Sequence, residues 1–460
     1  MASNPVEIPL SEIVTIKGGK RLPAGKNLQS TPSNHPYIRV RDVGQRSLPR
    51  EGIEYVPDDV FPSISRYIVQ ENDIVLSIVG TIGALSIVNA FYNSASLTEN
   101  CVKLTGLDCH DALFLYYYLA SSLGQQEIYQ GIVGAVQPKL PIYNIEKIKV
   151  LWPENKEERQ KIASILSRLD DKIELNHRIT QTLESMAQAI FKSWFVDFDP
   201  VKAKIDAIAE GRDPLRAAMS AISGKADAEL DAFPPEQYEQ LAATAALFPD
   251  EIEESALDEI PRGWAVRAAD SLTEVGIGKT PPRKEPQWFT EYQGDWRWVS
   301  IRDMGASGVF QQRSSEFLTS EAVSRFNVRV VPDRTVLLSF KLTIGRVAIT
   351  DGPMATNEAI AHFKLPSDSA VSSEYLYLYL KGFDYSTLGS TSSIADAVNS
   401  KTIREMPIIV ASSDLIDSFT KSVAPLFEEI RNRQNEIASL SATRDTLLPK
   451  LLSGEIEVPV

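Results

Sequence analysis

The sequence predicts an α+β protein built by internal duplication, in which two similar mixed α/β domains are each followed by one long helix. Apolar residues recur at alternating steps of four and three over two long stretches, the heptad pattern of a helix that packs along a narrow stripe. The two heptad series are related by a constant offset of 257 residues, and short motifs before them repeat at an offset near 260. With 460 residues, the chain is long enough for more than one core.

The heptad positions form two matching series. The first series is Ile162, Leu166, Leu169, Ile173, Asn176, Thr180, Leu183, Ala187, Ile190 and Trp194. The second series is Phe419, Val423, Leu426, Ile430, Arg433, Ile437, Leu440, Arg444, Leu447 and Leu451. Both are predicted to be the seams of coiled-coil helices. Asn176 corresponds to Arg433. Ala187 corresponds to Arg444. Each of these two pairs includes a polar seam residue, which we expect to set the register of antiparallel helices or to dock a subunit.

The first long helix is expected to occupy residues 154–198. Asn155 is suited to cap it, and Glu158 three residues later completes a variant of the capping box. The Asp199-Pro200 pair ends the helix, because the residue before a proline disfavours helical backbone. Forty residues at 1.5 Å each form a rod of roughly 60 Å, longer than an ordinary core helix.

The second long helix and a short tail are expected at residues 412–460. The helix should start near Asp414 and end at Ser453-Gly454, with glycine at the left-handed position that closes many helices. Pro425 removes one backbone hydrogen bond inside this helix. The sequence therefore predicts a kink or a break near Ala424.

The first mixed α/β domain is expected at residues 1–153. Strand-like runs at 37–40, 74–79 and 84–88 are separated by turns rich in Gly, Pro and Asn. Apolar residues on one face predict a helix over residues 111–123.

The second mixed domain is expected at residues 264–411 and repeats motifs of the first. The matching pairs are Gly19-Lys20 with Gly278-Lys279, Tyr37–Asp42 with Trp298–Asp303, Val75–Ser77 and Thr81–Gly83 with Leu337–Ser339 and Thr343–Gly345, Tyr116–Leu119 with Tyr377–Leu380, and Ala135–Lys139 with Ala397–Lys401. Between these motifs the halves share little. The sequence thus predicts one scaffold that carries two different surfaces.

The segment between the domains, residues 199–263, is expected to be an acidic linker. Counting from Asp197 to Gly263 gives 16 acidic and 6 basic residues. Short helices are predicted at 215–222 and 235–246. The main interpretation is a connector with some local helix, and the alternative is a DNA-mimicking or partner-docking segment.

The net charge of −14 argues at first against a nucleic-acid partner. The charge is unevenly distributed, however, because the first 50 residues hold 8 basic and only 3 acidic residues. At moderate salt concentration, screening limits the electrostatic influence of each region to about 10 Å. A basic patch can therefore coexist with a remote acidic segment, and the net charge does not exclude DNA.

The sequence is typical of a soluble cytoplasmic protein. Its two cysteines, Cys101 and Cys109, provide neither a disulfide framework nor a metal-ligand set, which suits a reducing compartment. No apolar run reaches about 18 residues, and the N-terminus lacks the basic and apolar regions of a signal peptide.

Nothing in the sequence resembles a catalytic motif, which predicts a non-enzyme that binds no metal or cofactor itself. The stretch 276–280 resembles the end of a phosphate-binding loop, but Thr273 stands where the first glycine belongs and Pro281-Pro282 follow where a helix should start. Asp170-Asp171-Lys172 has a nuclease-like spacing but lies within the heptads. It is interpreted as a solvated helix face.

Basic residues in loops are the remaining candidates for function. The candidate DNA-binding residues are Lys17, Lys20, Arg21, Lys26, Arg39, Arg41, Thr81, Gly83 and Lys139 in the first domain, and Lys279, Arg283, Lys284, Arg297, Arg302, Lys341, Thr343, Gly345 and Arg346 in the second, with Arg46, Arg50 and Arg313 as further basic loop residues. Arginine can bind guanine with two hydrogen bonds, and lysine can neutralise phosphate. The repeated Thr-Ile-Gly is either a β-turn that needs glycine or a turn whose N–H groups meet phosphate.

Taken together, these motifs resemble a known family. Both domains carry Leu-Ser followed by Thr-Ile-Gly, and the first carries Gln-Pro-Lys. The first helix closes with Ile-Phe-Lys-Ser-Trp-Phe-Val-Asp-Phe-Asp-Pro (190–200) and the second with Leu-Leu-Pro-Lys-Leu-Leu-Ser-Gly-Glu-Ile (447–456). The whole chain resembles the specificity (S) subunit of Type I restriction-modification enzymes. The second half departs from the pattern at position 400, where proline is missing, and at Pro425.

The resemblance implies two target recognition domains, two long helices that pair as an antiparallel coiled coil, and approximate two-fold symmetry. It implies assembly with two methyltransferase (M) subunits and, in the full enzyme, two restriction (R) subunits. S-adenosylmethionine would act in the M subunit on adenine N6, and ATP and Mg in the R subunit. Two similar but unlike domains would then read a bipartite, asymmetric DNA site, as a dimer reads two half-sites about one helical turn apart.

Two alternatives stay open at the level of sequence. One is a specificity subunit of a modification-only or phage-defence system that lacks the motor subunit. The other is a coiled-coil scaffold protein without DNA affinity, which would explain the helices but not the paired basic loops.

Overall fold

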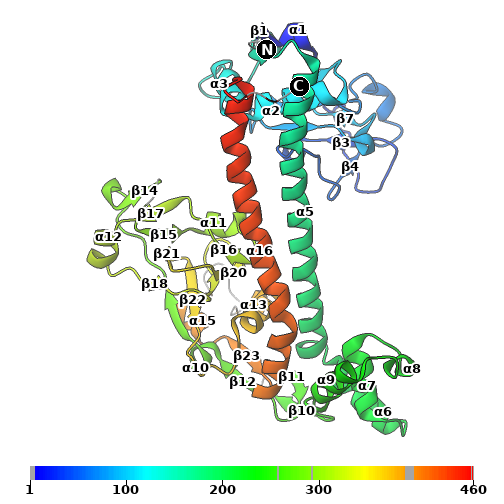
Figure 1. The fold of residues 1–460 in the computed structure, drawn as a ribbon, viewed down its shortest axis with the longest axis vertical. Helices are drawn as coiled ribbons and strands as arrows, with labels where there is room; N and C mark the ends of the chain where they lie inside the picture. The colour runs from blue at the N-terminus through cyan, green and yellow to red at the C-terminus, as the bar shows by residue number, and fades with distance from the viewer. Residues whose placement is uncertain (1–5, 256–257, 292–293, 389–397, 457, 459–460) are drawn as a thin grey trace. The chain divides into compact units, whose positions relative to one another are not determined.

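The computed structural model describes residues 6–255, 258–291, 294–388, 398–456 and 458, and the chain forms two compact units (Figure 1). Unit 1 comprises Met1–Leu175 and Ile437–Val460, and unit 2 comprises Asn176–Glu436. Each unit contains one mixed α/β domain and part of both long helices. Ala397, at which one predicted motif match begins, lies outside the described residues.

Unit 1 contains a four-stranded sheet of order β2-β8-β5-β6 and a three-stranded sheet of order β4-β3-β7. Its strands are β1 (Val6–Pro9), β2 (Thr15–Gly18), β3 (Pro36–Ile38), β4 (Glu54–Tyr55), β5 (Ile74–Ser77), β6 (Leu85–Ile87), β7 (Ser96–Leu97), β8 (Cys101–Thr105) and β9 (Lys149–Trp152). Its domain helices are α1 (Leu10–Ile13), α2 (Cys109–Ala120), α3 (Ser122–Gln130) and α4 (Ile142–Ile145), with 3-10 turns η1 (Val40–Asp42), η2 (Phe61–Ser63) and η3 (Ala90–Tyr92). The three predicted strand regions all contain strands.

The helix predicted over residues 111–123 is two helices in the structure. Ser121 interrupts it, because its backbone is extended, with φ −68° and ψ 164°. Its hydroxyl accepts a hydrogen bond from the Gly124 N–H at 3.2 Å and caps α3. The apolar periodicity runs through both helices, so it gave no sign of this break.

Unit 2 repeats the same sheet and extends it. Its five-stranded sheets have the orders β13-β22-β19-β20-β16 and β14-β17-β15-β21-β18. The strands are β12 (Ala265–Ala268), β13 (Glu274–Ile277), β14 (Phe289–Thr290), β15 (Trp296–Val299), β16 (Phe310–Gln311), β17 (Glu316–Leu318), β18 (Val330–Val331), β19 (Val336–Ser339), β20 (Val347–Thr350), β21 (Met354–Thr356), β22 (Ile360–Lys364) and β23 (Pro407–Val410). The helices are α10 (Ala269–Leu272), α11 (Ile301–Ala306), α12 (Ser320–Arg325), α13 (Ser373–Gly382) and α15 (Ser400–Arg404), with 3-10 turns η4 (Pro286–Trp288) and η5 (Tyr385–Leu388).

The two domains share one topology, which confirms the predicted duplication. The order β2-β8-β5-β6 in unit 1 is the order β13-β22-β19-β20 in unit 2. In both, the first and last domain strands pair antiparallel, β1 with β9 and β12 with β23. The order β4-β3-β7 likewise matches β17-β15-β21, and unit 2 adds β16 beside β20, β14 beside β17 and β18 beside β21. The scaffold is therefore common and the added strands differ, as predicted.

The long helices are α5 (Lys156–Phe195) and α16 (Ser413–Leu452). The side-chain oxygen of Asn155 accepts a hydrogen bond from the Glu157 N–H at 2.9 Å, which confirms the predicted cap. Gly454 has φ +75° after the end of α16, the left-handed conformation that was expected.

A kink or a break was predicted near Ala424, and the break is wrong, because α16 is helical without interruption from Ser413 to Leu452. Proline removes one N–H from the helix, but the residues on either side are held by tertiary packing. Val423 and Phe427 are completely buried in the core of unit 2, while Pro425 faces solvent. Burial of this apolar face outweighs the loss of a single hydrogen bond.

In unit 1, the first half of α5 packs against the last half of α16, so the two run antiparallel. Ile162, Leu166 and Leu451 belong to the same buried cluster as the sheet residues Leu76 and Val102. One core thus includes both the domain and the helix pair. All twenty seam positions of the two helices are buried or half-buried.

In unit 2, an aromatic cluster joins the last half of α5 to the first half of α16. The ring of Phe419 lies 5.8 Å from Phe191, 5.7 Å from Trp194 and 5.0 Å from Phe195, centroid to centroid. Tyr375 of α13 packs on the same ring at 6.1 Å. Aromatic pairs at these separations stabilise the fold by more than the burial of their apolar area alone would.

Asn176 and Arg433 lie across from each other in the helix pair of unit 2, where Arg433 Nη1 donates to Asn176 Oδ1 at 3.4 Å. The amide nitrogen of Asn176 and the hydroxyl of Thr180 are buried without a hydrogen-bond partner among the described residues. A buried polar group without a partner costs about 1–3 kcal/mol.

Replacing Asn176 with leucine is therefore expected to raise the stability of unit 2 by about 1–2 kcal/mol. Arg433 keeps its ion pairs with Glu429 and Glu436 in this variant. The measurement is the thermal unfolding midpoint, with H177L on the exposed face of α5 as the control that changes little. A lower midpoint for N176L would contradict this account.

The acidic segment is more ordered than a connector. It forms α6 (Asp199–Ala209), α7 (Pro214–Ser223), α8 (Asp227–Leu230), α9 (Pro235–Ala246) and the hairpin of β10 (Ile252–Ser255) and β11 (Asp258–Pro261). Ala218, Met219, Leu230 and Ala245 are completely buried in a small core of its own. Among the described residues, no helix has both the length and the apolar character needed to cross a membrane.

Candidate nucleic-acid interface

Each domain places a glycine where no other residue fits. A Cβ built on Gly19 would lie 2.0 Å from the carbonyl oxygen of Thr98, and one built on Gly278 would lie 2.1 Å from that of Asn357. Both contacts are with backbone atoms, which cannot move aside cheaply. The repeated Gly-Lys motif therefore has a steric cause for its glycine.

The lysine that follows each glycine is presented in the same way. The Tyr37 hydroxyl donates to the Lys20 carbonyl at 3.0 Å, and the Trp298 Nε1 donates to the Lys279 carbonyl at 3.2 Å. The aromatic residues come from the matching strands β3 and β15. Both lysine side chains are exposed, so each domain fixes the backbone of one lysine and leaves its charge in solvent.

The Leu-Ser…Thr-Ile-Gly motif is a hairpin closed from within by its serine. Ser339 Oγ donates to the Thr343 carbonyl at 2.7 Å and accepts from the Arg346 N–H at 3.0 Å. Ser77 makes the same pair of contacts, donating to the Thr81 carbonyl and accepting from the Ala84 N–H at 2.9 Å. Both serines are completely buried.

The glycines of these hairpins have a structural role. Gly83 has φ +90° and Gly345 has φ +89°, the left-handed conformation that glycine adopts without strain. This confirms the interpretation of the motif as a turn that requires glycine. Thr81 and Thr343 lie exposed beside the hairpin tips.

Arg39 is held by its own domain. Its Nε donates to Asp42 Oδ2 at 3.0 Å, and its Nη1 pairs with Glu54. Only 15% of its side chain is exposed. Glu54 also receives Arg41 Nη2 at 3.3 Å, but the Arg41 side chain is 67% exposed and remains accessible.

Two arginines of the second domain are also committed internally. Arg297 donates to the carbonyl oxygens of Gln312 at 2.6 Å and Asp351 at 2.7 Å. Arg346 donates to the Ile301 carbonyl at 2.6 Å. Together with Arg39, these side chains brace loops, and the sequence offered no means of telling them from free ones.

The other predicted basic residues are exposed, some of them with an acidic neighbour. The exposed basic candidates are Lys17, Lys20, Arg21, Lys26, Arg41, Arg50, Lys139, Lys279, Arg283, Lys284, Arg302, Arg313 and Lys341. Lys26 pairs with Asp59 at 2.8 Å, and Arg21 with Glu99 at 3.7 Å. Exposed ion pairs of this kind contribute little to stability, so the basic side chain can leave its acidic neighbour to bind phosphate.

Arg283 and Arg302 lie together in unit 2, where they line one surface hollow of about 600 Å³ with Ser315 and Glu316. Arg283 pairs with Glu316 at 2.6 Å and stacks on the Trp298 ring at 4.5 Å. Stacking and the ion pair fix its planar guanidinium at the rim.

Arg46 does not lie in a free basic loop, because it is bound to the long helix of its own unit. Its Nη1 donates to the Ser167 carbonyl at 3.3 Å, and its Nη2 pairs with Asp171. Its side chain is 17% exposed. Arg46 therefore fastens the domain to α5.

Asp170 does not lie on a solvated face, contrary to the sequence-based interpretation. The Tyr117 hydroxyl donates to its Oδ2 at 2.7 Å, and Arg444 Nη1 donates to its Oδ1 at 2.9 Å. Burial and the neighbouring Asp170 carboxylate raise the pKa of Tyr117 well above its ordinary value. One carboxylate thus joins the domain helix α2 to both long helices of unit 1.

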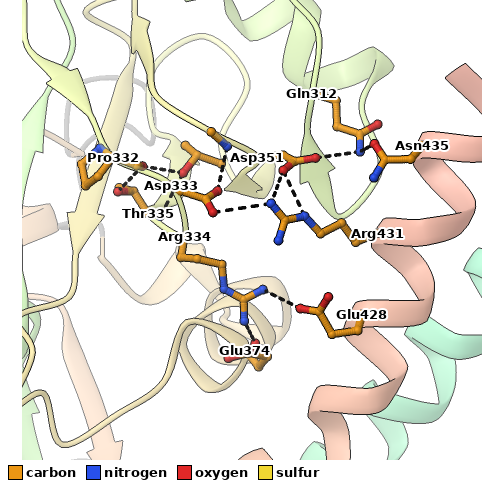
Figure 2. A network of polar contacts seen from close by, with 12 residues as sticks. Gln312, Pro332, Asp333, Arg334, Thr335, Asp351, Glu374, Glu428, Arg431 and Asn435 are labelled. Atoms are coloured by element: carbon orange, nitrogen blue, oxygen red, sulfur yellow. Dashed lines mark hydrogen bonds and ion pairs between the residues drawn. The ribbon is translucent and has the colours of Figure 1, made fainter.

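Unit 2 has its own ionic attachment between domain and long helix, shown in Figure 2. Arg431 of α16 donates through Nε to Asp351 Oδ1 at 3.0 Å and lies 3.5 Å from Asp333. Arg334 pairs with Glu374 and lies 3.6 Å from Glu428 of α16. Burial raises the pKa of Asp351, but its hydrogen bonds to Arg431 and Gln312 outweigh this and hold it below its ordinary value.

These attachment residues were missed from the sequence. The heptad pattern marks seam positions, whereas Asp170 and Arg431 lie beside the seam, where charge is usually solvated. Both residues are charged and lie on the side of a long helix that faces a domain. That side cannot be identified from the sequence until the fold is known.

Residues 3–185 and 261–414 match the family described as Type I restriction modification DNA specificity domain. The chain is 37% identical over 334 residues to the Type I restriction enzyme HindI specificity subunit of Haemophilus influenzae, covering 69% of this chain and 71% of that protein. It is 24% identical over 438 residues to the MjaIX specificity subunit of Methanocaldococcus jannaschii, covering 93% and 85% respectively.

The fold has a counterpart among solved structures. The crystal structure of the S subunit of a Type I restriction-modification system from M. genitalium aligns with a TM-score of 0.52 at 16% identity, covering 97% of this chain and 96% of that chain. The family match covers both domains, and the resemblance drawn from the motifs is confirmed. The chain therefore belongs to the specificity subunits of Type I restriction-modification systems, the non-catalytic components that recognise DNA.

Proposed function

We propose that this subunit selects a bipartite, asymmetric DNA site, and that the domain of each unit reads one half. The observation that carries the proposal is the repeated Gly-Lys element. A glycine in close contact with the backbone and an aromatic donor at the matching position, Tyr37 or Trp298, present an exposed Lys20 in one domain and an exposed Lys279 in the other. Because the strands added in unit 2 change the surface around this shared element, the two half-sites should differ in sequence.

The proposed recognition domains are residues 1–153 and 264–411, with the long helices at 154–198 and 412–460 and the acidic segment at 199–263. Within them, phosphate and base contacts are assigned to the exposed residues. The proposed DNA-binding set is Lys17, Lys20, Arg21, Lys26, Arg41, Thr81 and Lys139 in unit 1, and Lys279, Arg283, Lys284, Arg302, Lys341 and Thr343 in unit 2. Arg39, Arg297, Arg346, Gly83 and Gly345 are assigned to shaping the loops.

The proposed partners are two methyltransferase (M) subunits and, in a full restriction enzyme, two restriction (R) subunits. The duplication supports this stoichiometry, since two copies of one scaffold offer two equivalent attachment places. S-adenosylmethionine would be used in the methyltransferase on adenine N6, and ATP with Mg in the restriction subunit. The complex would act in the cytoplasm, where its DNA lies.

The proposed function is tested by methylome sequencing of cells that carry this subunit and its methyltransferase partner. The expected result is one methylated motif made of two unlike halves around a fixed spacer. Gel-shift binding by the assembled complex should prefer that motif over random DNA. A complex that methylates without sequence preference would overturn the proposal.

Lys20→Ala and Lys279→Ala should each weaken contacts with a different half of the motif. Losing one phosphate contact is expected to lower the salt dependence of binding by about one counterion. Binding titrations at several salt concentrations measure the salt dependence, and hydroxyl-radical footprinting of the assembled complex locates the affected half. The control is K202A, which removes an exposed lysine of the acidic segment. If both variants lost protection over the same half, the assignment of one domain to each half would fail.

A further inference from the structure

Leu342 is the most exposed large apolar side chain in the described part of the chain, at 99%. It lies in the hairpin between β19 and β20, beside the exposed Lys341 and Thr343. A solvated leucine gains nothing from burial, and single exposed apolar residues are in themselves ordinary. Its backbone, however, is unusual.

Leu342 has φ +61°, in the left-handed region. The Thr343 N–H donates to the Lys341 carbonyl at 2.6 Å, so the chain reverses within three residues with Leu342 in the middle. This conformation costs a leucine about 1–2 kcal/mol, and such strain is found mainly where function requires the side chain.

The first domain shows which residue the turn itself favours. Gly80 occupies the equivalent position, two residues before the repeated Ile-Gly, and has φ +82°. The base of the hairpin is the same, with Ser77 and Ser339 making matching hydrogen bonds. The tips differ, because the Ile82 N–H donates to the Gly80 carbonyl at 3.0 Å, so the tight turn of the first domain is centred on Thr81. The second domain therefore carries a leucine where the fold would accept glycine at lower cost.

The base of the hairpin is held on both sides. Ser339, completely buried, binds both sides of the loop, and β19 and β20 are paired in register up to Leu338 and Val347. A side chain that projects from such a base keeps its position when it enters a groove, and it loses little backbone entropy on binding.

We propose that Leu342 is a specificity-determining residue that contacts bases in the half-site read by the domain of unit 2, an inference that rests on the proposed function. Lys341 and Thr343, on either side, contact backbone phosphates. A leucine cannot bind phosphate through charge or hydrogen bonds. On DNA, its contact is with apolar base surface, such as a thymine methyl group or an opened base step. Gly80 gives the first half-site no equivalent contact, which contributes to the asymmetry of the target.

The test uses Leu342→Gly in the assembled complex of the full chain with its methyltransferase subunit. Glycine suits the left-handed turn, so the thermal midpoint should stay equal or rise. Affinity for the methylated motif should fall about tenfold, while affinity for non-specific DNA and the salt dependence of binding should not change. Base-pair scanning of the motif should show relaxed discrimination at one or two positions in a single half.

Two further variants make the result decisive. Leu342→Asn, which also tolerates the left-handed turn, should reproduce the loss. Lys341→Ala should instead weaken specific and non-specific binding alike and lower the salt dependence.

The inference would be overturned if L342G kept wild-type affinity and discrimination, or lost specific and non-specific binding equally. A wild-type complex without any preferred motif would instead overturn the proposed function, and the inference with it.

Discussion

Gly278→Ala is expected to prevent unit 2 from folding, with a loss of more than about 4 kcal/mol. The new Cβ would lie 2.1 Å from the carbonyl oxygen of Asn357 and 2.5 Å from that of Thr356. Both belong to backbone at and just beyond the end of β21, so relief would require the sheet to separate. The measurement is hydrogen exchange followed by mass spectrometry, which should show lost protection across β13, β22 and β19.

The matched control is Gly382→Ala. A Cβ at Gly382, the last residue of α13, meets no atom within 4 Å. Alanine there should leave protection unchanged or stabilise the unit by up to about 1 kcal/mol. Normal protection in both variants would show that the glycine of the Gly-Lys motif is not required by close approach of the backbone.

Asp170→Ala is expected to destabilise unit 1 by about 3 kcal/mol. The substitution leaves the buried Tyr117 hydroxyl and Arg444 Nη1 without their shared acceptor. Faster exchange should appear in α2 and in the paired parts of α5 and α16 that belong to unit 1, while the sheets of unit 2 exchange as before.

Asp445→Ala serves as the control for Asp170, because it pairs with the same arginine. Arg444 Nη2 lies 2.8 Å from Asp445, whose side chain is 64% exposed. Loss of this solvated pair should cost no more than about 1 kcal/mol. Equal effects of the two substitutions would show that burial does not set the strength of these ion pairs.

The architecture was largely predictable because it is periodic and repeated. Heptads report directly which face of a helix is buried, and an offset that stays constant over two series reports duplication. The pattern could not reveal local interruptions of a helix that leave the apolar periodicity unchanged. Ser121 divides a helix without disturbing its apolar face, and Pro425 leaves α16 intact because Val423 and Phe427 bury their side chains.

The candidate interface was predictable in kind and only partly in detail. Basic residues cluster in loops of both domains, but Arg39 meets Glu54 and Arg297 meets Asp351 only after strands distant in sequence have paired. Leu342 was missed for the opposite reason. Its residue type suggests a core, and only its left-handed backbone and full exposure reveal a different use.

Unit 1 is assembled from both ends of the chain, and this has a consequence for synthesis on the ribosome. Unit 2 is contiguous, whereas Ile162 and Leu166 await Leu451, which is translated nearly 290 residues later. At about 5–20 residues per second, the part of the apolar stripe of α5 that packs on α16 stays uncovered for roughly 15–60 s. The nascent subunit therefore exposes an aggregation-prone apolar helix face during that interval. A truncated message would release chains that lack α16 and never bury this face.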